Sequence, residues 1–417
     1  MSPAAAVVEP PVSDIDEFED AASLPSETEN EEEKVRVEEM MARLSTGECA
    51  EAGGEAAGGI RDEGNDGNAG GGWSFDSPEE KAEMCAQRAQ LWTWLKGVGS
   101  NMFREGINLT KISLPVCLFE ARSFLERMST NWDYINYLVQ AADAKDPVVR
   151  MKYVVAFAVA GLSRQVSFHK PFNPILGETF QATYPNGVEV YCEQISHHPP
   201  VSSWQVVDPK GRFMFYGNGN WVAGIKGNAV KGRQSGINCV TFADGSKISY
   251  ELPGIVVKGV LWGHRCIKYV GEMKFVDDTS GVSCDVVIDP QPNQSWVGSF
   301  FRSKKAAGYI PDLVKGTITK KGAAVDSCSG NWMTHVEWDK GMDGKSSTPA
   351  RLWERKTTLF TASIPVAAPL PSDCRHREDV ATLRAGDQPA SQEWKYKLEH
   401  LQRDDRKLRK DGGGYEH

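Results

Sequence analysis

The chain has 417 residues, 40% of them hydrophobic, and can therefore bury a sizeable core. No run approaches the roughly 18 apolar residues of a membrane span, and the N-terminus lacks a signal peptide's basic start and apolar middle, so we expect a cytosolic protein. Residues 1–70 hold 19 acidic and 4 basic side chains, whereas residues 71–417 hold 43 basic and 37 acidic ones. The mildly basic charge of residues 71–417 suits contact with an anionic membrane surface and is too weak for a nucleic-acid-binding protein.

The first 72 residues are rich in Glu, Ala, Gly and Ser. A segment of this composition cannot bury enough apolar surface to offset the entropy of ordering it, so we predict that residues 1–72 are disordered and that a folded domain spans residues 73–417.

The nine cysteines, from Cys49 to Cys374, are scattered singly, without a C-x-x-C pair or the spacing of a metal site. Such an arrangement is typical of free thiols in a reducing compartment, so we expect no disulfide, no metal and no cofactor.

A helix is predicted from Ser77 to about Gly97, because Ser77-Pro78-Glu79-Glu80 is a capping box with proline at the first helical position. Its second half is too apolar for a solvated helix, and a plain core helix is one explanation. Helical patterns also occur at 124–128, at 134–142 and from Asp146 onward. We expect these three helices to support the fold and to contribute no functional residues.

The most informative stretch is residues 164–204. Residues 188–193 alternate as a half-buried strand does, and the strand leads to His197 and His198, which two prolines follow. Upstream, two prolines hold an extended turn that orients Lys170 and Asn173. Lysine, asparagine and paired histidines are hydrogen-bond donors, so these residues predict an anion site at a sheet rim.

KPFNPILGE (170–178) and EQISHHPPVS (193–202) resemble the fingerprint of the oxysterol-binding protein family, whose members transfer lipids. The resemblance covers about 92–403, with the fingerprint at 170–204. It implies a mainly β fold with flanking helices: a large incomplete antiparallel barrel around a lipid tunnel, with an N-terminal lid, central helices and a C-terminal helix.

The residues after Gly177 independently predict many short strands separated by glycine or Asp-Gly turns, which most economically close into a barrel. The predicted strands are 212–216, 237–242, 248–252, 266–275, 282–288, 332–338 and 351–360. Between them, residues 303–321 carry five lysines, which form either a solvated face or a membrane-facing patch.

The last predicted element is a helix over 391–410 that carries Lys395, Glu399 and Arg403 at i, i+4 and i+8. Considered alone, it is an amphipathic surface helix with a salt-bridged flank. However, K-x-x-L-E-x-x-Q-R resembles the family's C-terminal motif, which implies that these three residues reach a lipid headgroup. Residues 373–379 follow the family's D-x-R-x-R-P-D, with Glu378 in place of proline, a departure that we expect not to touch the headgroup positions.

The resemblance also implies roles for two N-terminal segments. Residues 91–108 correspond to the lid, with Leu91, Trp92, Trp94, Leu95 and Val98 as its apolar residues. In the acidic tail, a short peptide resembles the FFAT motif that docks many family members on VAMP-associated proteins at the endoplasmic reticulum; its core is Glu17, Phe18, Asp20 and Ala21. Glu19 and Ser23 depart from that motif, and a chance match in an acidic tail is the alternative.

The ligand that the resemblance implies is phosphatidylinositol 4-phosphate. We expect His197, His198 and Arg403 on the 4-phosphate, since guanidinium groups bind phosphate in a bidentate manner. Lys170, Asn173 and Lys395 are expected on the ring and diester, with Glu399 accepting ring hydroxyls.

Three functions are compatible with these features. The first is exchange of the phosphoinositide for a sterol or another lipid between membranes, as a peripheral membrane protein at contact sites with the endoplasmic reticulum. The second is a phosphoinositide or sterol sensor, or a contact-site scaffold, without net transport. The third, a metal-dependent hydrolase, is disfavoured because adjacent strand residues point to opposite sides and no carboxylate completes a site. We therefore expect no enzyme.

Overall fold

The computed structural model describes residues 71–98, 107–108, 113–226, 228–290, 310–343 and 346–411. All of them belong to one compact unit, Ala52–Pro290 together with Ile310–His417. The α-helices are α3 (Pro78–Val98), α5 (Phe124–Ser129), α6 (Asn136–Asp143), α7 (Pro147–Leu162), α8 (Glu378–Arg384) and α9 (Gln388–Asp411). The short 3-10 helices are η2 (Val116–Leu118), η3 (Thr130–Trp132) and η5 (Cys374–His376).

Nineteen strands accompany these helices in the described ranges. They are β1 (Trp73–Ser74), β2 (Ile107–Asn108), β3 (Phe119–Ser123), β4 (Lys170–Phe172), β5 (Thr179–Thr183), β6 (Glu189–His197), β7 (Pro200–Val207), β8 (Phe213–Lys226), β9 (Ala229–Ser235), β10 (Asn238–Phe242), β11 (Lys247–Tyr250), β12 (Gly254–Lys258), β13 (Cys266–Asp277), β14 (Val282–Ile288), β15 (Leu313–Lys320), β16 (Ala323–Asn331), β17 (His335–Trp338), β18 (Ala350–Glu354) and β19 (Ile364–Pro365).

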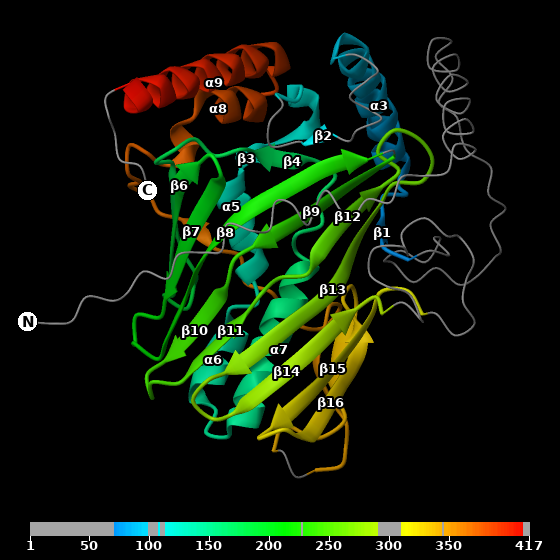
Figure 1. The fold of residues 1–417 in the computed structure, drawn as a ribbon, viewed down its shortest axis with the longest axis vertical. Helices are drawn as coiled ribbons and strands as arrows, with labels where there is room; N and C mark the ends of the chain where they lie inside the picture. Colours follow the sequence, from blue (N-terminus) through cyan, green and yellow to red (C-terminus); the bar gives the residue numbers. More distant parts are fainter. Residues whose placement is uncertain are drawn as a thin grey trace, which may run out of the picture. The chain divides into compact units, whose positions relative to one another are not determined.

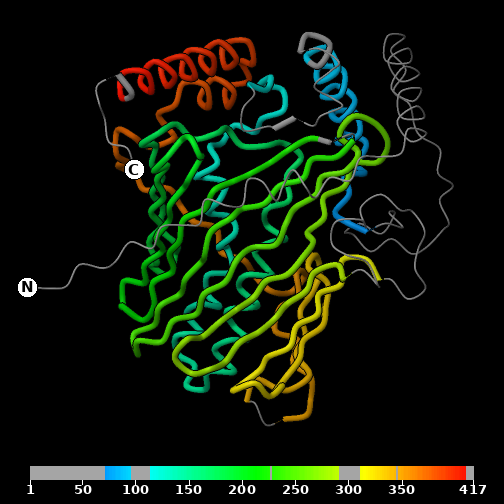
Figure 2. Tube along the Cα trace, viewed as in Figure 1, coloured from blue at the N-terminus to red at the C-terminus, as the bar shows by residue number. Residues whose placement is uncertain are grey.

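Seventeen of these strands form one antiparallel sheet, and β3 and β4 form a separate parallel pair. Strands β5 to β8 pair consecutively, and the long β8 then pairs with β10 along its first half and with β9 along its second. Both branches return to β13 through β11 and β12, and β13 to β18 pair consecutively (Figures 1 and 2). In the described part β18 pairs with β17 and β19 pairs with β5, and no register joins β18 to β19, so the barrel stays incomplete.

Helices α6 and α7 lie against the face of the sheet that β13 and β14 contribute to (Figure 1). The side chain of Asp146 caps α7 by accepting a hydrogen bond of 2.8 Å from the amide of Val148, and Pro147 occupies the first turn. Most of α7 is buried, including Phe157, which packs edge-on against Phe215 of β8 at 5.5 Å. The helices thus fill one half of the sheet's inner side.

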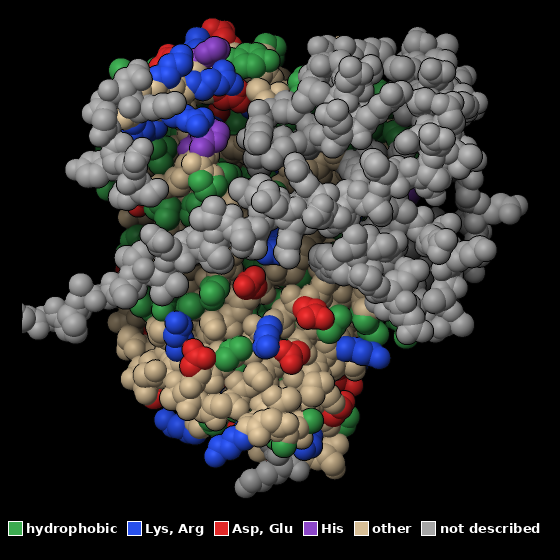
Figure 3. Space-filling model, viewed as in Figure 1, with side chains coloured by type: hydrophobic (Ala, Val, Ile, Leu, Met, Phe, Trp, Pro, Cys, Tyr) green, Lys and Arg blue, Asp and Glu red, His purple; other side chains and the backbone are tan. Residues whose placement is uncertain are grey.

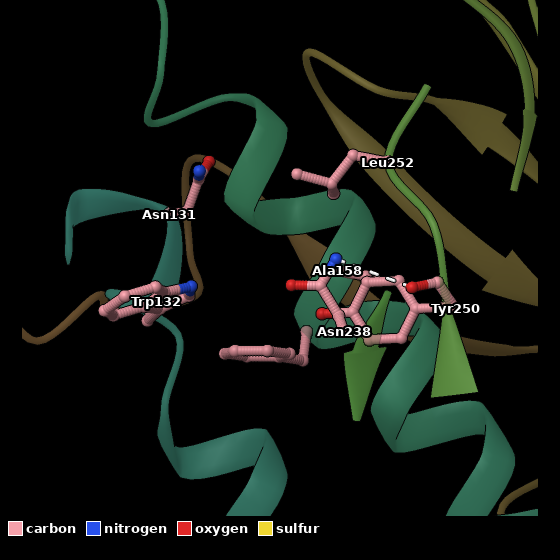
Figure 4. A pocket seen from close by; sticks show the side chains of 7 residues that line it. Asn131, Trp132, Ala158, Asn238, Tyr250 and Leu252 are labelled. Carbon is pink, nitrogen blue, oxygen red and sulfur yellow. Dashed lines mark hydrogen bonds between the residues drawn. The ribbon is translucent and has the colours of Figure 1, made fainter. Parts of the chain in front are cut away.

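A small cavity lies in this packed half, between η3, α7 and the β10 and β11 pair (Figure 4). Its lining residues are Asn131, Trp132, Phe157, Ala158, Asn238, Tyr250 and Leu252. Its volume is about 10 Å³, which is room for one water at most. An acyl chain therefore cannot enter this part of the core.

Helices α8 and α9 lie together at one end of the sheet, next to the β3 and β4 pair (Figure 1). A second, smaller apolar cluster supports this end; its buried members are Leu114, Val116, Phe119, Phe172 and Val380, and Trp94 of α3 packs against it. Segments from the N-terminal, middle and C-terminal parts of the chain therefore share one small core beneath α9.

The predicted elements are mostly confirmed, with differences that have local causes. β14 occupies the predicted span, and β10, β11 and β13 begin and end within two residues of theirs. β8 extends ten residues beyond the predicted end at Tyr216, because the strand runs through Gly217 and Gly219, which resemble a turn in sequence. The predicted strand 351–360 ends at Glu354, where a hydrogen-bonded turn begins. The longer strands that were not predicted are β5, β7, β9, β12, β15 and β16, of which β15 lies in the lysine-rich segment 303–321.

Two further expectations need correction. Cys85 is disulfide-bonded, while seven other described cysteines are free. Cysteines that are distant in sequence can meet in the fold, so scattered positions did not exclude a pair. The folded part also includes Gly72, inside the predicted disordered segment, because its amide donates a hydrogen bond of 2.6 Å to Asp312. No helix in the described ranges has the length and apolar character to cross a membrane.

Candidate functional site

Lysine, histidine and glutamate side chains from distant segments converge at the end of the sheet beneath α9. Lys170 comes from β4, His197 and His198 from the hairpin between β6 and β7, and Lys395 and Glu399 from α9. Figure 3 shows basic and histidine side chains gathered over this end of the described residues. The predicted rim site is thus assembled from the middle and the end of the chain.

Lys395 is the buried centre of this cluster. Its Nζ donates hydrogen bonds of 2.6 Å to Glu399 Oε1 and 2.7 Å to Ser113 Oγ. Ser113 Oγ also lies 3.1 Å from the same Glu399 oxygen and donates to it. Lys395, Glu399 and Ser113 therefore form a closed triangle of hydrogen bonds that ties α9 to the segment after α3.

Lys170 lies next to this triangle. Its Nζ donates a hydrogen bond of 2.8 Å to Asn173 Oδ1 and lies 4.4 Å from the centroid of the Phe119 ring. The Nζ of Lys395 lies 5.5 Å from the same centroid, so one aromatic ring contacts two ammonium groups. Burial, and then the positive charge of Lys395, lower the pKa of Lys170 to about 7, and Glu399 opposes this change.

The two imidazoles contact each other, with ring centroids 4.6 Å apart and planes at 73°. This corrects the expectation that they point to opposite sides: β6 ends at His197, and His198 already lies in the turn before β7. Burial, and then the charges of His198 and Arg406, lower the pKa of His197 to about 4. Both imidazoles are therefore neutral near pH 7 when no anion is bound, since the pKa of His198 is also lowered by burial and by Arg406.

Arg403, the third residue of the predicted helix motif, lies at the outer margin of the cluster. Its Nη2 is 3.6 Å from Glu399 Oε2, and its side chain is 58% exposed. Arg406, which the sequence analysis did not select, acts electrostatically on both imidazoles. Its position one helical turn beyond the family motif explains why the motif did not reveal it.

Arg377 is a second residue that was missed. It is buried, forms ion pairs with Glu178 (2.8 Å) and Asp379 (2.7 Å), and donates a hydrogen bond of 2.7 Å to the carbonyl of Asn173. Ser123 also contacts Glu178. Arg377, which matches the family pattern, thereby fixes the backbone of the Lys170–Asn173 turn, while the expectation about the departure at Glu378 stays a prediction.

The predicted lid residues belong to α3, whose capping box is confirmed by reciprocal hydrogen bonds between Ser77 and Glu80. Leu91 and Trp92 are buried, and Trp94 is half-buried against the small apolar cluster. Leu95 and Val98 end the helix, and their side chains lie outside the described residues. The middle of α3 is fixed by Arg88, which donates hydrogen bonds to the carbonyls of Gly259 and Gly263.

Other predicted residues receive no structural test. Glu17, Phe18, Asp20 and Ala21 lie outside the described residues. Within the described ranges, no group of three or more His, Cys, Asp or Glu side chains is placed to hold a metal ion.

Comparison with known proteins gives a consistent result. The oxysterol-binding protein family model matches residues 99–417. Oxysterol-binding protein 9 of Dictyostelium discoideum is 33% identical over 356 residues, which are 81% of this chain and 79% of that protein. Oxysterol-binding protein-related protein 7 of Homo sapiens is 28% identical over 328 residues, 74% of this chain and 37% of that protein. The chain thus spans little more than a third of the human relative.

Solved structures share the fold. The crystal structure of the Osh1 ORD domain in complex with cholesterol has a TM-score of 0.61 and 25% identity, and the match covers 79% of this chain and 81% of that chain. The Osh3 ORD of Saccharomyces cerevisiae in complex with PI(4)P has a TM-score of 0.58 and 22% identity, over 74% of this chain and 82% of that chain.

The fold and the matches define a lipid-binding domain in which a large, barrel-like antiparallel sheet surrounds a tunnel. The chain belongs to the oxysterol-binding protein family.

Proposed function

We propose that this chain binds phosphatidylinositol 4-phosphate and exchanges it for a sterol or another lipid between membranes. The observation that carries the proposal is the cluster of hydrogen-bond donors in which the side chains of Lys170 and Lys395 and the paired imidazoles converge near the carboxylate of Glu399. A phosphorylated inositol ring needs several donors at fixed separation, and this cluster supplies them.

Within the site, His197, His198 and Arg403 are assigned to the 4-phosphate. One atom supports this assignment, because His197 Nδ1 is buried and has no hydrogen-bond partner among the described residues. Lys170, Lys395 and Asn173 are assigned to the ring and the diester. Glu399 Oε2, which is buried and has no hydrogen-bond partner among the described residues, would then accept a hydrogen bond from a ring hydroxyl.

The apolar chamber for the acyl chains is proposed beyond the packed half of the sheet. Early in β8, the inner face of the sheet packs against α7. Further along, the antiparallel register places five apolar side chains of β8, β9 and β12 on this same face: Trp221, Ala223, Val230, Ile255 and Val257. None of these five side chains is fully buried, unlike the alternating buried residues of β14. A half-buried apolar inner face supports a lipid chamber, in which each buried methylene contributes about 0.8 kcal/mol.

The second lipid is proposed to compete for the same chamber. Trp221 Nε1 and Gln234 Nε2 are buried there without a hydrogen-bond partner among the described residues, and the two residues are cross-strand neighbours. A lipid hydroxyl would satisfy such atoms. The likeness to the Osh1 ORD domain, solved with cholesterol, supports a sterol as that lipid.

The exchange is tested with donor vesicles that hold phosphatidylinositol 4-phosphate and acceptor vesicles that hold sterol. Net movement of both lipids in opposite directions is expected, and each lipid should accelerate transport of the other. Extraction without net transfer would instead establish a sensor or contact-site scaffold. No enzymatic step is proposed.

The lid, the membrane surface and the tail complete the proposal. We place the lid at residues 91–108 of a domain over 73–417, and contact with an anionic membrane at the end where α9 lies.

The FFAT-like peptide is proposed to dock on VAMP-associated proteins at the endoplasmic reticulum, an assignment that rests on sequence alone. Phe18→Ala with Asp20→Ala should abolish binding to a VAMP-associated protein in a pull-down and leave lipid extraction unchanged; retained binding would refute the assignment.

A further inference from the structure

Two buried arginines lie side by side where α3 meets the loop before β13. Arg88 of α3 is 5% exposed, and Arg265, directly before β13, is 6% exposed. They share the carbonyl of Gly259, which accepts hydrogen bonds from Arg88 Nη2 at 2.7 Å and from Arg265 Nε at 3.4 Å. Two positive charges are therefore close together inside the protein.

Among the described residues, the hydrogen-bond partners of both guanidiniums are uncharged. They are the carbonyls of Gly259, Val260 and Gly263 and the side-chain oxygen of Gln87. Burial lowers the pKa of both arginines to about 10, and the charge of Arg88 adds to this effect on Arg265. Both side chains remain charged at pH 7. A pair of buried like charges without a counter-ion is unfavourable.

The carboxylates of the same region pair with other side chains. Asp76 lies 3.0 Å from the ring of His264, and Glu83 of α3 lies 3.0 Å from the ring of His169. Both carboxylates are exposed. No described carboxylate forms an ion pair with Arg88 or Arg265, so the described part of the chain does not supply the missing negative charge.

Arg88 also has unused hydrogen-bond donors. A guanidinium has five N–H groups, whereas Arg88 makes two hydrogen bonds, both from Nη2. Its Nε is buried and has no partner among the described residues, which costs free energy unless an acceptor is bound. The ring centroid of Phe168 lies 5.3 Å from Cζ of Arg265, so one wall of the arginine pair is apolar. An apolar wall strengthens any charge interaction made there.

We propose that Arg88 and Arg265 form a binding site for a phosphate-type oxyanion. Arg88 donates hydrogen bonds to the anion from Nε and Nη1, and Arg265 contributes its charge. The source of the anion is inorganic phosphate or the phosphate group of an anionic phospholipid, because both present the same charged oxygens. The bound anion holds α3, which carries the first predicted lid residues, against the loop at 259–265. This site is separate from the headgroup cluster and does not depend on its assignment.

The test measures how inorganic phosphate changes the thermal unfolding of the full chain, with chloride at equal ionic strength as the reference. Every protein measured carries His197→Ala and His198→Ala, so that phosphate binding by the paired imidazoles does not contribute. The test variant is Arg88→Gln in this background. The control is Lys81→Gln, which removes the same charge from an exposed position of α3.

In the background chain, phosphate should raise the midpoint of thermal unfolding in a concentration-dependent manner, because a ligand of the folded state stabilises it. The phosphate concentration needed for a given shift should rise about tenfold or more in Arg88→Gln, because charge-assisted hydrogen bonds are lost. It should change by no more than about twofold in Lys81→Gln. Phosphate should also slow the amide hydrogen exchange of residues 259–265 in the background chain.

Arg88→Lys is a second variant, for the case that Arg88→Gln does not fold. It keeps the positive charge but lacks the Nε donor and the planar group. The phosphate concentration needed for a given shift should rise about threefold or more in this variant.

A second arm identifies the source of the anion. The same proteins are titrated with phosphatidylcholine vesicles that contain or lack phosphatidic acid. A loss of about fivefold or more in affinity for the phosphatidic acid vesicles in Arg88→Gln, and not in Lys81→Gln, supports a lipid phosphate. Unchanged vesicle binding together with a weakened response to inorganic phosphate supports the free ion.

Three results would overturn the inference. The first is the absence of any stabilisation of the background chain by phosphate beyond that by chloride. The second is an equal response to phosphate in Arg88→Gln, Arg88→Lys and the background chain, which is expected if Arg88 only supports α3. The third is an equal loss in Arg88→Gln and Lys81→Gln, which would show general electrostatic attraction. The proposed phosphoinositide function is unaffected by all three, because its imidazoles are absent from every protein measured.

Discussion

Lys395 and Glu399 lie one helical turn apart on α9 and form an ion pair of 2.6 Å in which the lysine is buried. Glu399→Gln should lower the free energy of unfolding by about 1–3 kcal/mol, because the buried ammonium loses its charged partner. Chemical denaturation measures the change. Glu393→Gln, which breaks the exposed pair with Lys397, is the control and should cost less than about 0.5 kcal/mol. Equal losses in the two variants would contradict the assigned role of Glu399.

Ser113 is expected to position Lys395 for the headgroup. Ser113→Ala removes the hydrogen bonds to Lys395 and Glu399, and should weaken phosphatidylinositol 4-phosphate binding by about three- to tenfold. Ser113→Thr keeps the hydroxyl and should restore most of the affinity. Dissociation constants from vesicle titrations provide the measurement, and identical affinities for the alanine and threonine variants would exclude a role for the hydroxyl.

The affinity for phosphatidylinositol 4-phosphate should fall as the pH rises above 7. The pKa of Lys170 is about 7 in the free protein, and a bound phosphate raises it, so binding takes up a proton in the window above pH 7. Linkage then lowers the affinity by at most about tenfold per pH unit in that window. Lys170→Arg keeps the charge without titrating and should flatten the profile. An unchanged slope in this variant would show that another group titrates.

Arg377 is expected to be the main structural support of the fingerprint turn. Arg377→Lys keeps the charge but cannot bridge Glu178, Asp379 and the Asn173 carbonyl at once, so it should lower the free energy of unfolding by about 3–5 kcal/mol. Denaturant unfolding measures this. Arg384→Lys, at an exposed position 3.6 Å from Glu126, is the control and should cost less than about 0.5 kcal/mol. A change below about 1 kcal/mol at Arg377 would contradict the assigned role.

Local sequence signals predicted much of this fold because their physical causes are local. The alternation in residues 188–193 matches the buried and exposed faces of β6, and the capping residues Ser77 and Asp146 set the starts of α3 and α7. Strand length was harder to predict where glycines interrupt the pattern. β8 continues through Gly217 and Gly219 because neighbouring strands pair with it there, and that tertiary cause is invisible in a short window.

The candidate site was predictable where its charged or polar residues belong to short sequence motifs, as Lys170, His197 and Glu399 do. Ser113 and Phe119 were not, because a serine and a phenylalanine become site residues only when the fold brings α9 and β4 beside them. Arg377 matched the family pattern but received no role in the site, because its contact with Asn173 spans 204 residues of sequence. The pairing of His197 with His198 depended on where β6 ends, which alternation alone does not fix.

The most direct test of the account is extraction of phosphatidylinositol 4-phosphate from vesicles by the chain with His197→Ala and His198→Ala. Because both side chains are at the rim and outside the apolar core, thermal unfolding should match the wild type. The account predicts that this folded variant extracts no phosphoinositide, while the wild-type chain does. Extraction at the wild-type level by the folded variant would contradict the assignment of the paired imidazoles to the headgroup.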